Sequence, residues 1–440
     1  MAIKVGLISL GCDKNLVDSE YMLGILKKNG YIITNDQKEA DVIIINTCGF
    51  IESAKQESID TILEMAGLKK HGKCKLLIAT GCLAQRYSDE LLLEIPELDA
   101  VVGTGDFDKI DEIIQQKEPA RINLTQNKSF LDYDIDNRLT VYPYIAFVKI
   151  AEGCNNCCSY CAIPQIKGAY KSRHINSIKK EVEVLVSRGI REINLVAQDT
   201  SNYGEDIYGK PSLPMLLKEL EKVEGDFWIR ILYAYPNNID DELLNTIKNS
   251  SKVVKYLDIP LQHINDRILK LMNRPMDSRF IKELIEKIRV NIPDITLRTT
   301  FIVGFPTETD EEFEELLDFI QNYRFDRLGA FQYSMEEGTF AYTLKPQIPQ
   351  RIKRERYDKL MLLQKSISRR KNLELKGKLL EVLAENYDPA KNIMVGRSQK
   401  DAPFVDGTVK FHCKECKAGH FYTVKIIKAL EYDLFGEVVS

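Results

Sequence analysis

The sequence predicts an α/β protein built from a doubly wound parallel sheet, a partial (β/α)6 barrel and a small antiparallel β-barrel. Apolar strands alternate with helical stretches in residues 1–125, and the same alternation returns in residues 140–370. Such alternation, at the length of a βαβ unit, is typical of parallel sheets. A third observation predicts the small barrel, because the strands of residues 371–440 are short and separated by turns.

In residues 1–125, a cysteine follows each of three apolar strands. The strands are expected at residues 4–10, 41–45 and 75–79, and the cysteines are Cys12, Cys48 and Cys82. Ligands gather beyond the carboxyl ends of parallel strands, so we expect the three thiols to converge and to bind a metal cluster. The alternative is three buried structural cysteines, which are common. Cys74 precedes its strand and is interpreted as a free thiol.

Helical and then polar sequence completes this first part. Helices are expected over residues 15–28 and 51–66, where apolar side chains recur at helical spacing. One more apolar turn lies at residues 100–103, and the sequence is mostly polar from about residue 105 to 141. Residues 126–138 are rich in Asp and Asn, which predicts a linker.

Six strand and helix units follow in residues 140–370. Strands are expected at residues 145–150, 193–198, 228–235, 256–262, 295–304 and 328–333. Helices are expected between them at residues 177–187, 212–223, 240–248 and 310–321, and a basic helix at 351–371. Six units predict a partial barrel, and the carboxyl ends of its strands are expected to carry the functional site, as in complete (β/α) barrels.

Four cysteines lie within eight residues directly after the first strand of this barrel. Cys154, Cys158 and Cys161 form the pattern C-x-x-x-C-x-x-C. This spacing allows one irregular loop to place three thiolates around a cuboidal iron–sulfur cluster. The fourth iron then has no protein ligand and is open to a substrate or cosubstrate, like the open position of a catalytic metal site.

Two other interpretations of this loop stay open. Zinc also binds closely spaced cysteines, but a structural zinc needs a fourth ligand nearby, and the next histidine is His174. The cluster is therefore favoured over zinc. Cys157 could take the place of Cys158 in a different set of three ligands, and we interpret it as an extra thiol.

The composition excludes several classes of protein. With 44% apolar and 29% charged residues, the 440-residue chain is typical of an ordinary globular protein. Its net charge of −4 provides no basic field for a phosphate backbone, so a nucleic acid is not the expected substrate. No apolar run approaches the roughly 18 residues that cross a bilayer. The N-terminus is not typical of a signal peptide, so we expect a cytoplasmic protein whose cysteines serve as ligands.

A second group of thiols lies near the C-terminus. Cys413 and Cys416, flanked by His412 and His420, are compatible with a zinc site at a hairpin tip, although simple exposure on a turn is the favoured interpretation. From Lys371 onward there are 11 Lys and Arg against 10 Asp and Glu, a net charge of about +1. This balance is weak for a domain that clamps RNA.

The loop with Cys154, Cys158 and Cys161, and with the aromatic Tyr160 before its last cysteine, resembles that of the radical S-adenosylmethionine (SAM) enzymes. In that superfamily the open iron chelates SAM and passes it an electron, which releases a 5'-deoxyadenosyl radical. The order of the three parts resembles the methylthiotransferase family. This resemblance implies an N-terminal methylthiotransferase domain (1–125), a radical SAM domain (140–370) and a C-terminal TRAM barrel (371–440).

Several stretches are similar to the branch of this family that modifies an aspartate of a ribosomal protein (RimO-like). They are residues 11–20, 197–200, 233–236, 333–339 and 401–407. Asp13 stands where that branch often has proline. The other branch modifies a tRNA adenosine (MiaB-like) and typically has Gly-Gln-Asn-Val at the positions of 197–200. The acidic pair Glu336 and Glu337 is interpreted as a surface for a basic partner, which ribosomal proteins are.

The resemblance implies that a methylthio group replaces a hydrogen on the β-carbon of one aspartate in small-subunit ribosomal protein S twelve. No side-chain base removes so weakly acidic a proton, so the cofactors carry the chemistry and no catalytic side chain is expected. The alternatives are a tRNA adenosine methylthiotransferase and, from another class, a non-enzymatic metal-cluster module that docks on the ribosome.

The same resemblance implies two 4Fe-4S clusters and SAM as cofactors. Cys154, Cys158 and Cys161 would hold the radical-generating cluster, and Cys12, Cys48 and Cys82 an auxiliary cluster from which sulfur is delivered. The resemblance also makes Tyr160 a candidate contact to the cofactor. Gln198, Asp199 and Glu336 are expected to face the site from strand ends, Gln198 toward the cofactor and the two carboxylates toward the substrate. An electron donor and a sulfur donor, both of unknown identity, are expected as further partners.

Overall fold

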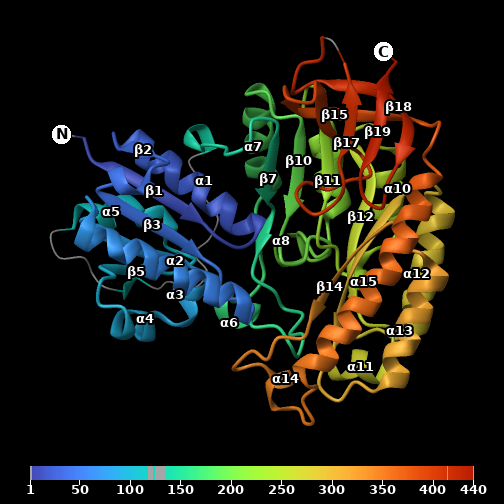
Figure 1. Ribbon diagram of the computed structural model, residues 1–440, viewed down its shortest axis with the longest axis horizontal. Coiled ribbons are helices and arrows are strands. Elements are labelled where there is room, and N and C mark those ends of the chain that lie inside the picture. The colour runs from blue at the N-terminus through green and yellow to red at the C-terminus, as the bar shows by residue number, and fades with distance from the viewer. Residues whose placement is uncertain (1, 117–121, 124–134, 414, 440) are drawn as a thin grey trace.

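The computed structural model describes residues 2–116, 122–123, 135–413 and 415–439 (Figure 1). The expected domain boundary at residue 125 and most of the expected linker at 126–138 lie outside these residues. Among the described residues, no helix is both long and apolar enough to cross a membrane. The chain forms an N-terminal parallel sheet, a central parallel sheet and a terminal closed barrel.

The N-terminal sheet has six parallel strands in the order β2-β1-β3-β4-β5-β6. They are β1 (Lys4–Ser9), β2 (Ile32–Thr34), β3 (Val42–Thr47), β4 (Leu76–Gly81), β5 (Ala100–Val102) and β6 (Ile122–Asn123). The helices are α1 (Asp13–Lys28), α2 (Glu52–His71), α3 (Cys82–Arg86), α4 (Ser88–Glu94) and α5 (Ile110–Gln115). The sequence did not predict β2, because this edge strand is only three residues long and has no buried residue.

Alternating residues of β3 show why this sheet is covered on both faces. Ile43 and Ile45 pack with α2, α3 and α4, whereas Val42 and Ile44 pack with α1 and α5. All six residues of β3 are buried. A strand buried on both faces is apolar without alternation, which is the sequence pattern of a doubly wound sheet. The doubly wound fold predicted for this part is therefore confirmed.

The central sheet has six parallel strands in the order β14-β13-β12-β11-β10-β7. They are β7 (Ile145–Lys149), β10 (Glu192–Val196), β11 (Trp228–Ile231), β12 (Val253–Gln262), β13 (Thr296–Val303) and β14 (Arg327–Gln332). A separate two-stranded sheet pairs β8 (Ala151–Glu152) with β9 (Lys171–Ser172). Because β7 and β14 are edge strands that do not pair with each other, the barrel is partial, as predicted.

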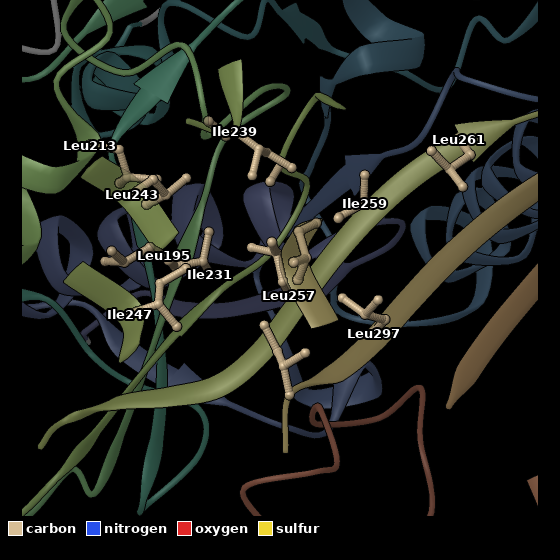
Figure 2. Close-up of a cluster of buried hydrophobic side chains, with 14 of the residues drawn as sticks. Leu195, Leu213, Ile231, Ile239, Leu243, Ile247, Leu257, Ile259, Leu261 and Leu297 are labelled. Carbon is tan, nitrogen blue, oxygen red and sulfur yellow. The ribbon is translucent and has the colours of Figure 1, made fainter. Parts of the chain in front are cut away.

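Helices cover the outer face of this sheet. They are α7 (Ile175–Ser187), α9 (Leu213–Glu221), α10 (Asp241–Asn249), α12 (Ser278–Asn291), α13 (Asp310–Tyr323) and α15 (Gln350–Leu373). The shorter helices of this part are α6 (Ile163–Lys167), α8 (Glu205–Tyr208), α11 (Asp266–Leu271) and α14 (Phe340–Thr343). Figure 2 shows Leu195, Ile231 and Leu257 from the strands packed with side chains of the neighbouring elements. Short 3-10 turns lie at Gln37–Glu39, Phe107–Lys109, Ile135–Asn137 and Pro236–Asn238.

The terminal barrel is closed, with strand order β15-β16-β17-β19-β18. Its strands are β15 (Leu379–Asp388), β16 (Ile393–Ser398), β17 (Val409–His412), β18 (Phe421–Ala429) and β19 (Leu434–Val438). The antiparallel prediction is wrong for one pair, because β17 and β19 run parallel. A ring with an odd number of strands cannot alternate direction throughout, so one parallel neighbour is unavoidable. The strand β19 was not expected from the sequence, so the odd number of strands in the barrel was not expected either.

Buried ion pairs fix the terminal barrel to the end of the central sheet opposite α6 and α14 (Figure 1). Glu192 of β10 accepts a hydrogen bond from Arg230 at 2.7 Å and pairs with Arg397 of β16. Arg327 of β14 pairs with Asp401 at 2.5 Å. These buried charges close one end of the central partial barrel. The opposite end, at the carboxyl ends of its strands, is left for the functional site.

Cys413 and Cys416 form a disulfide in the terminal barrel. The expectation that the cysteines of this chain serve as ligands is therefore wrong for these two. The favoured interpretation, two exposed free thiols, is also wrong. A Cys-x-x-Cys turn brings the two sulfurs close enough to bond, which the spacing alone does not distinguish from a zinc site.

Candidate functional site

The loop with the Cys154, Cys158 and Cys161 trio leaves the carboxyl end of β7 through the short strand β8. Gly153 has a φ of +79°, and a Cβ there would lie 2.2 Å from the Ala169 carbonyl oxygen. The turn therefore requires glycine. The Cys154 N–H donates to the Gly168 carbonyl at 3.2 Å, and the Cys161 N–H donates to the Cys158 carbonyl at 3.0 Å. The loop is thus closed on itself by its own backbone.

Two other segments anchor the same loop from outside. The Ser159 N–H donates to the Met272 carbonyl at 3.0 Å, and the Ser159 carbonyl accepts from the Ala341 N–H at 2.8 Å. Asn273 Nδ2 donates to the Cys157 carbonyl at 2.8 Å. Cys157 has a φ of +49° and is exposed, whereas the trio is half-buried. Cys157 therefore differs from the other three thiols in exposure, and its interpretation as an extra thiol stays a prediction.

Burial and the neighbouring thiols favour the protonated form of Cys154 and Cys161. Burial raises the pKa of Cys154 to about 11 and that of Cys161 to about 12, and the neighbouring thiols raise both pKa values further. Binding a metal cluster requires thiolates, so cluster binding has to supply the energy of deprotonation and releases protons. Such a closely packed set of thiols fits an iron–sulfur cluster, whose iron ions compensate the charge.

Arg274 supplies a positive charge to the same loop. Its Nη1 lies 3.9 Å from Cys158 Sγ and 3.4 Å from the Tyr160 hydroxyl, and its guanidinium stacks at 4.3 Å on the ring of Tyr235. Only 4% of Arg274 is exposed. The sequence analysis missed this residue, because it follows α11 far along the chain and belongs to no recognisable motif. Tyr160, the predicted cofactor contact, lies in the loop as expected.

Asp199 lies beside a cavity of about 200 Å³ that Cys154, Asn156, Tyr170 and Tyr235 also line. Its carboxylate accepts from Asn156 Nδ2 at 2.9 Å and from Ser201 Oγ at 2.7 Å. Burial raises the pKa of Asp199, and these hydrogen bonds oppose the rise. The observed contacts therefore tie the cysteine loop to the end of β10, and the predicted contact of Asp199 to a substrate stays a prediction.

The second trio of cysteines lies at the carboxyl edge of the N-terminal sheet, as its three strand ends predict. Cys12 precedes α1, Cys48 follows β3, and Cys82 is the first residue of α3. Asn15 connects these ends: its Nδ2 donates to the Leu10 carbonyl at 3.2 Å and to the Thr47 carbonyl at 2.9 Å. Its Oδ1 lies 3.8 Å from Cys82 Sγ.

Close backbone packing brings the first two strand ends together. A Cβ on Gly11 would lie 2.8 Å from Cys48 Cβ and 3.1 Å from Cys48 Sγ, so only glycine fits beside this thiol. Burial raises the pKa of Cys82 to about 12, Lys167 opposes the rise, and the Cys12 and Cys48 thiols add to it. The three thiols are therefore close enough to influence one another, although they are far apart in the sequence.

The two trios meet at the contact between α3 and α6. Cys82 packs in one buried cluster with Ala162 and Ile166, and Ala162 directly follows Cys161. Cys82 therefore packs against the residue that directly follows Cys161. Within the described residues, no three His, Cys, Asp or Glu side chains are placed to share one metal ion. The ligands of a cuboidal cluster bind different irons, so they do not have to share an ion.

Buried charges lie behind this contact. Lys149 of β7 pairs with Asp18 of α1 at 2.5 Å and with Glu152 at 2.6 Å. Lys167 of α6 pairs with Glu152 at 3.0 Å. Gln198, a predicted cofactor contact, donates to Glu152 at 3.0 Å through Nε2, while its buried Oε1 has no hydrogen-bond partner among the described residues. A lysine inside an apolar strand was the only sequence signal of this network.

Glu336 does not form the exposed acidic surface that the sequence predicted. It is 2% exposed and pairs with Arg86 at 2.8 Å and with Lys55 at 3.2 Å, both from the N-terminal domain. Arg86 also donates to the Glu337 carbonyl at 2.7 Å. The prediction is corrected because the neighbouring domain supplies cations that the local sequence does not reveal. Glu336 thus holds the two domains together at the end of β14.

Comparison with known proteins gives a consistent result. The chain matches three family descriptions: uncharacterized protein family UPF0004 (residues 4–103), the Radical SAM superfamily (148–320) and the TRAM domain (377–439). The radical SAM methyltransferase TsrM from Kitasatospora setae superposes with a TM-score of 0.55 over 75% of this chain and 73% of its own, at 13% identity. The cobalamin-dependent radical SAM enzyme OxsB also gives 0.55, over 83% of this chain and 56% of its own, at 13% identity. Fold, cysteine loop and family match define a radical SAM protein.

Full-length relatives are more specific. The ribosomal protein uS12 methylthiotransferase RimO of Thermoanaerobacter sp. (strain X514) is 53% identical over 98% of this chain and 99% of its own length. The protein of the same name from Geobacter sulfurreducens is 50% identical over 99% of both chains. The chain belongs to the RimO family.

Proposed function

We propose that this chain is an enzyme that transfers a methylthio group to the β-carbon of an aspartate in ribosomal protein uS12. The identity of about 50% to RimO proteins over the whole chain supports the reaction and the substrate. The observation that carries the proposal is the contact of Cys82 with Ala162 and Ile166. Through this contact, a sulfur-bearing site on the N-terminal sheet lies directly beside a radical-generating loop.

Radical SAM proteins contain a 4Fe-4S cluster and SAM. Cys154, Cys158 and Cys161 are the residues proposed to hold the cluster, since they form one closed, half-buried loop. When bound, these groups supply a carbon radical that removes a hydrogen atom from an unactivated carbon, which no side-chain base achieves. Tyr160 and Gln198 are proposed to contact SAM from the loop and from the end of β10.

A second 4Fe-4S cluster is proposed on Cys12, Cys48 and Cys82. Three converging thiols at the edge of the N-terminal domain, proposed as residues 1–125, support it. Three protein ligands leave one iron open, and that iron is the proposed place for the sulfur to be transferred. Asn15 keeps these strand ends together through hydrogen bonds to Leu10 and Thr47.

The remaining domains have separate proposed roles. The radical SAM domain, proposed as residues 140–370, orients the two trios toward each other through the Glu336 ion pairs. The TRAM domain, proposed as residues 371–440, closes the opposite end of the barrel. Because the proposed substrate is a ribosomal protein, the reaction is expected in the cytoplasm. An electron donor and a sulfur donor are required as further partners.

The test is an anaerobic reaction of the reconstituted enzyme with SAM, a reductant and either uS12 or tRNA. The expected result is the added methylthio mass on the uS12 peptide that contains the aspartate, with none on nucleosides. A methylthio nucleoside would overturn the substrate in favour of the tRNA adenosine. Absence of 5'-deoxyadenosine would overturn the enzymatic function and support a docking module.

A further inference from the structure

Four buried charged side chains form a network behind the contact between α3 and α6. Asp18 comes from α1, Lys149 from β7, Glu152 from β8 and Lys167 from α6. Each is less than a tenth exposed. Two cations and two carboxylates balance one another, so the group is neutral before any cluster binds. A balanced buried group of this kind is not stabilising by itself, because desolvation offsets the attraction.

Lys167 differs from Lys149 in the quality of its contacts. Lys149 pairs with both carboxylates at 2.5 and 2.6 Å, whereas Lys167 reaches Glu152 at 3.0 Å and Asp18 only at 3.7 Å. The Lys167 ammonium has no hydrogen-bond partner among the described residues, although it is 4% exposed. The ion pair with Glu152 leaves further N–H groups of this buried ammonium without an acceptor, and a buried donor favours a position next to one.

The position of Lys167 indicates what that acceptor is. Lys167 directly follows Ile166, which packs against Cys82. On the other side, Asn15 lies 3.8 Å from Cys82 Sγ, and Asp18 follows Asn15 by one turn of α1. Lys167 is also close enough to act on this thiol electrostatically, since its charge lowers the pKa of Cys82 against the effect of burial. A bound cluster with three thiolate ligands would add negative charge at this place.

We propose that Lys167 donates to the sulfur-bearing group held by Cys12, Cys48 and Cys82, and that its charge raises the reduction potential of that cluster. This inference rests on the second cluster of the proposed function. Net charge and hydrogen bonds to sulfur set the potential of iron–sulfur clusters. A nearby cation favours the reduced state, because that state is more negative by one electron and the interior screens the attraction weakly. Lys167 is thus a positioning residue that acts on the auxiliary cluster.

The test uses the full chain with Cys154→Ala, Cys158→Ala and Cys161→Ala, which leaves only the auxiliary cluster. Iron is counted first, and the cluster is then reduced stepwise with dithionite while its paramagnetic signal is recorded. With Lys167→Gln added, we expect the equilibrium constant for reduction of the cluster to fall at least about tenfold. This corresponds to a reduction potential that is lower by about 59 mV for one electron. With Lys167→Arg, which keeps the charge, we expect a value near that of the parent.

Glu152→Gln is the matched second variant, because it removes a negative charge from the same network. We expect it to shift the potential upward, opposite to Lys167→Gln, whereas a purely structural role would lower cluster occupancy in both. An unchanged potential in Lys167→Gln at full iron content overturns the inference alone. If Lys167→Gln loses the cluster, an unchanged potential in Glu152→Gln overturns it instead. No iron in the parent with three alanines overturns the second cluster of the proposed function.

Discussion

The two cysteine trios solve the same chemical problem in different ways. Cys154, Cys158 and Cys161 lie in one loop that its own backbone hydrogen bonds close. Cys12, Cys48 and Cys82 come from three strand ends, which the register of the sheet, the close packing of Gly11 and the side chain of Asn15 bring together. The comparison teaches that the first site depends on a short segment, whereas the second depends on an entire folded domain.

The difference extends to the charges around each trio. Arg274, a single guanidinium beside Cys158, serves the loop. Beside Cys82 lies the buried network of four charges, with Lys167 at its edge. Both trios also depend on the interface between the domains, which Glu336 holds closed through Arg86 and Lys55. Substitutions at these points therefore separate the contributions of loop, sheet and interface.

The largest effect is expected from Cys158→Ala in the loop. Even partners that only support metal ligands cost about 10- to 100-fold in affinity or activity, so the loss of a ligand should exceed this. We expect no measurable 5'-deoxyadenosine from SAM. Iron counting should show roughly half of the wild-type content, because the strand-end trio stays intact. Cys157→Ala is the control, and 5'-deoxyadenosine formation in Cys158→Ala would show that Cys157 replaces Cys158.

Cys82→Ala tests the trio at the strand ends of the N-terminal sheet. Methylthio-uS12 should be lost, while 5'-deoxyadenosine continues to form, because the loop trio is untouched. Both products are measured in one reaction: methylthio-uS12 by mass spectrometry of its peptide, and 5'-deoxyadenosine by direct quantification. The matched control is Cys74→Ala, which removes a buried thiol of the same domain that precedes β4. Full methylthio transfer by Cys82→Ala would exclude a role of this trio.

Glu336→Gln should loosen the interface without touching either trio. Removing one partner of a buried ion pair typically costs about 3–5 kcal/mol. The cost here should lie at or below the low end of that range, because Lys55 keeps its ion pair with Glu52 and Arg86 its hydrogen bond to the Gly49 carbonyl. We expect faster hydrogen exchange of the α2 and α3 segments and a lower ratio of methylthio product to 5'-deoxyadenosine. Glu337→Gln is the control, since that neighbouring side chain is exposed. Equal exchange rates in both variants would contradict the role of Glu336.

Acid should weaken a second contact between the domains, in which no cysteine takes part. Glu181 of α7 is buried, and although burial alone would raise its pKa, Arg173 and Arg138 lower it below 4.5. Tyr21 of α1 donates to the same carboxylate at 2.7 Å. A carboxyl group with a lowered pKa stabilises the folded state above pH 4.5, and this stabilisation is lost as the pH falls through the folded pKa.

Denaturant unfolding of the cluster-free protein at a series of pH values measures this effect. Wild type should lose stability steeply below pH 4.5, whereas Glu181→Gln should be less stable at neutral pH and should show a flatter dependence in that range. Glu183→Gln, on the exposed side of the same helix, is the control. An equally steep acid dependence in Glu181→Gln and wild type would exclude this carboxylate as the source.

The smallest effect is expected from the third group of thiols. Cys413→Ser with Cys416→Ser removes a disulfide that closes a very short loop, and short loops contribute little, about 2 kcal/mol or less. Iron content, 5'-deoxyadenosine and methylthio-uS12 should match wild type. Thermal unfolding of the terminal barrel measures the difference in stability. Loss of iron in this double variant would show that these thiols bind metal after all.

The sequence by itself determined the three-part α/β fold and both cysteine trios. The apolar runs along the chain indicate where the strands lie. The positions of Cys12, Cys48 and Cys82, just beyond β1 and β3 and directly after β4, can therefore be read from the sequence. The spacing of Cys154, Cys158 and Cys161 is likewise local. The predictions failed where partners are distant: the parallel pair of β17 and β19 depends on the closure of a ring.

Only the tertiary structure decided which residues surround the two trios. The placement of Glu336 against Arg86, of Arg274 against Cys158, and of Ile166 against Cys82 joins segments that no periodicity or motif connects. The physical reason is that a buried charge needs a partner, and that partner can come from any part of the chain that folding brings within a few ångströms. Sequence patterns report what one segment does, whereas these contacts depend on the packing of two domains.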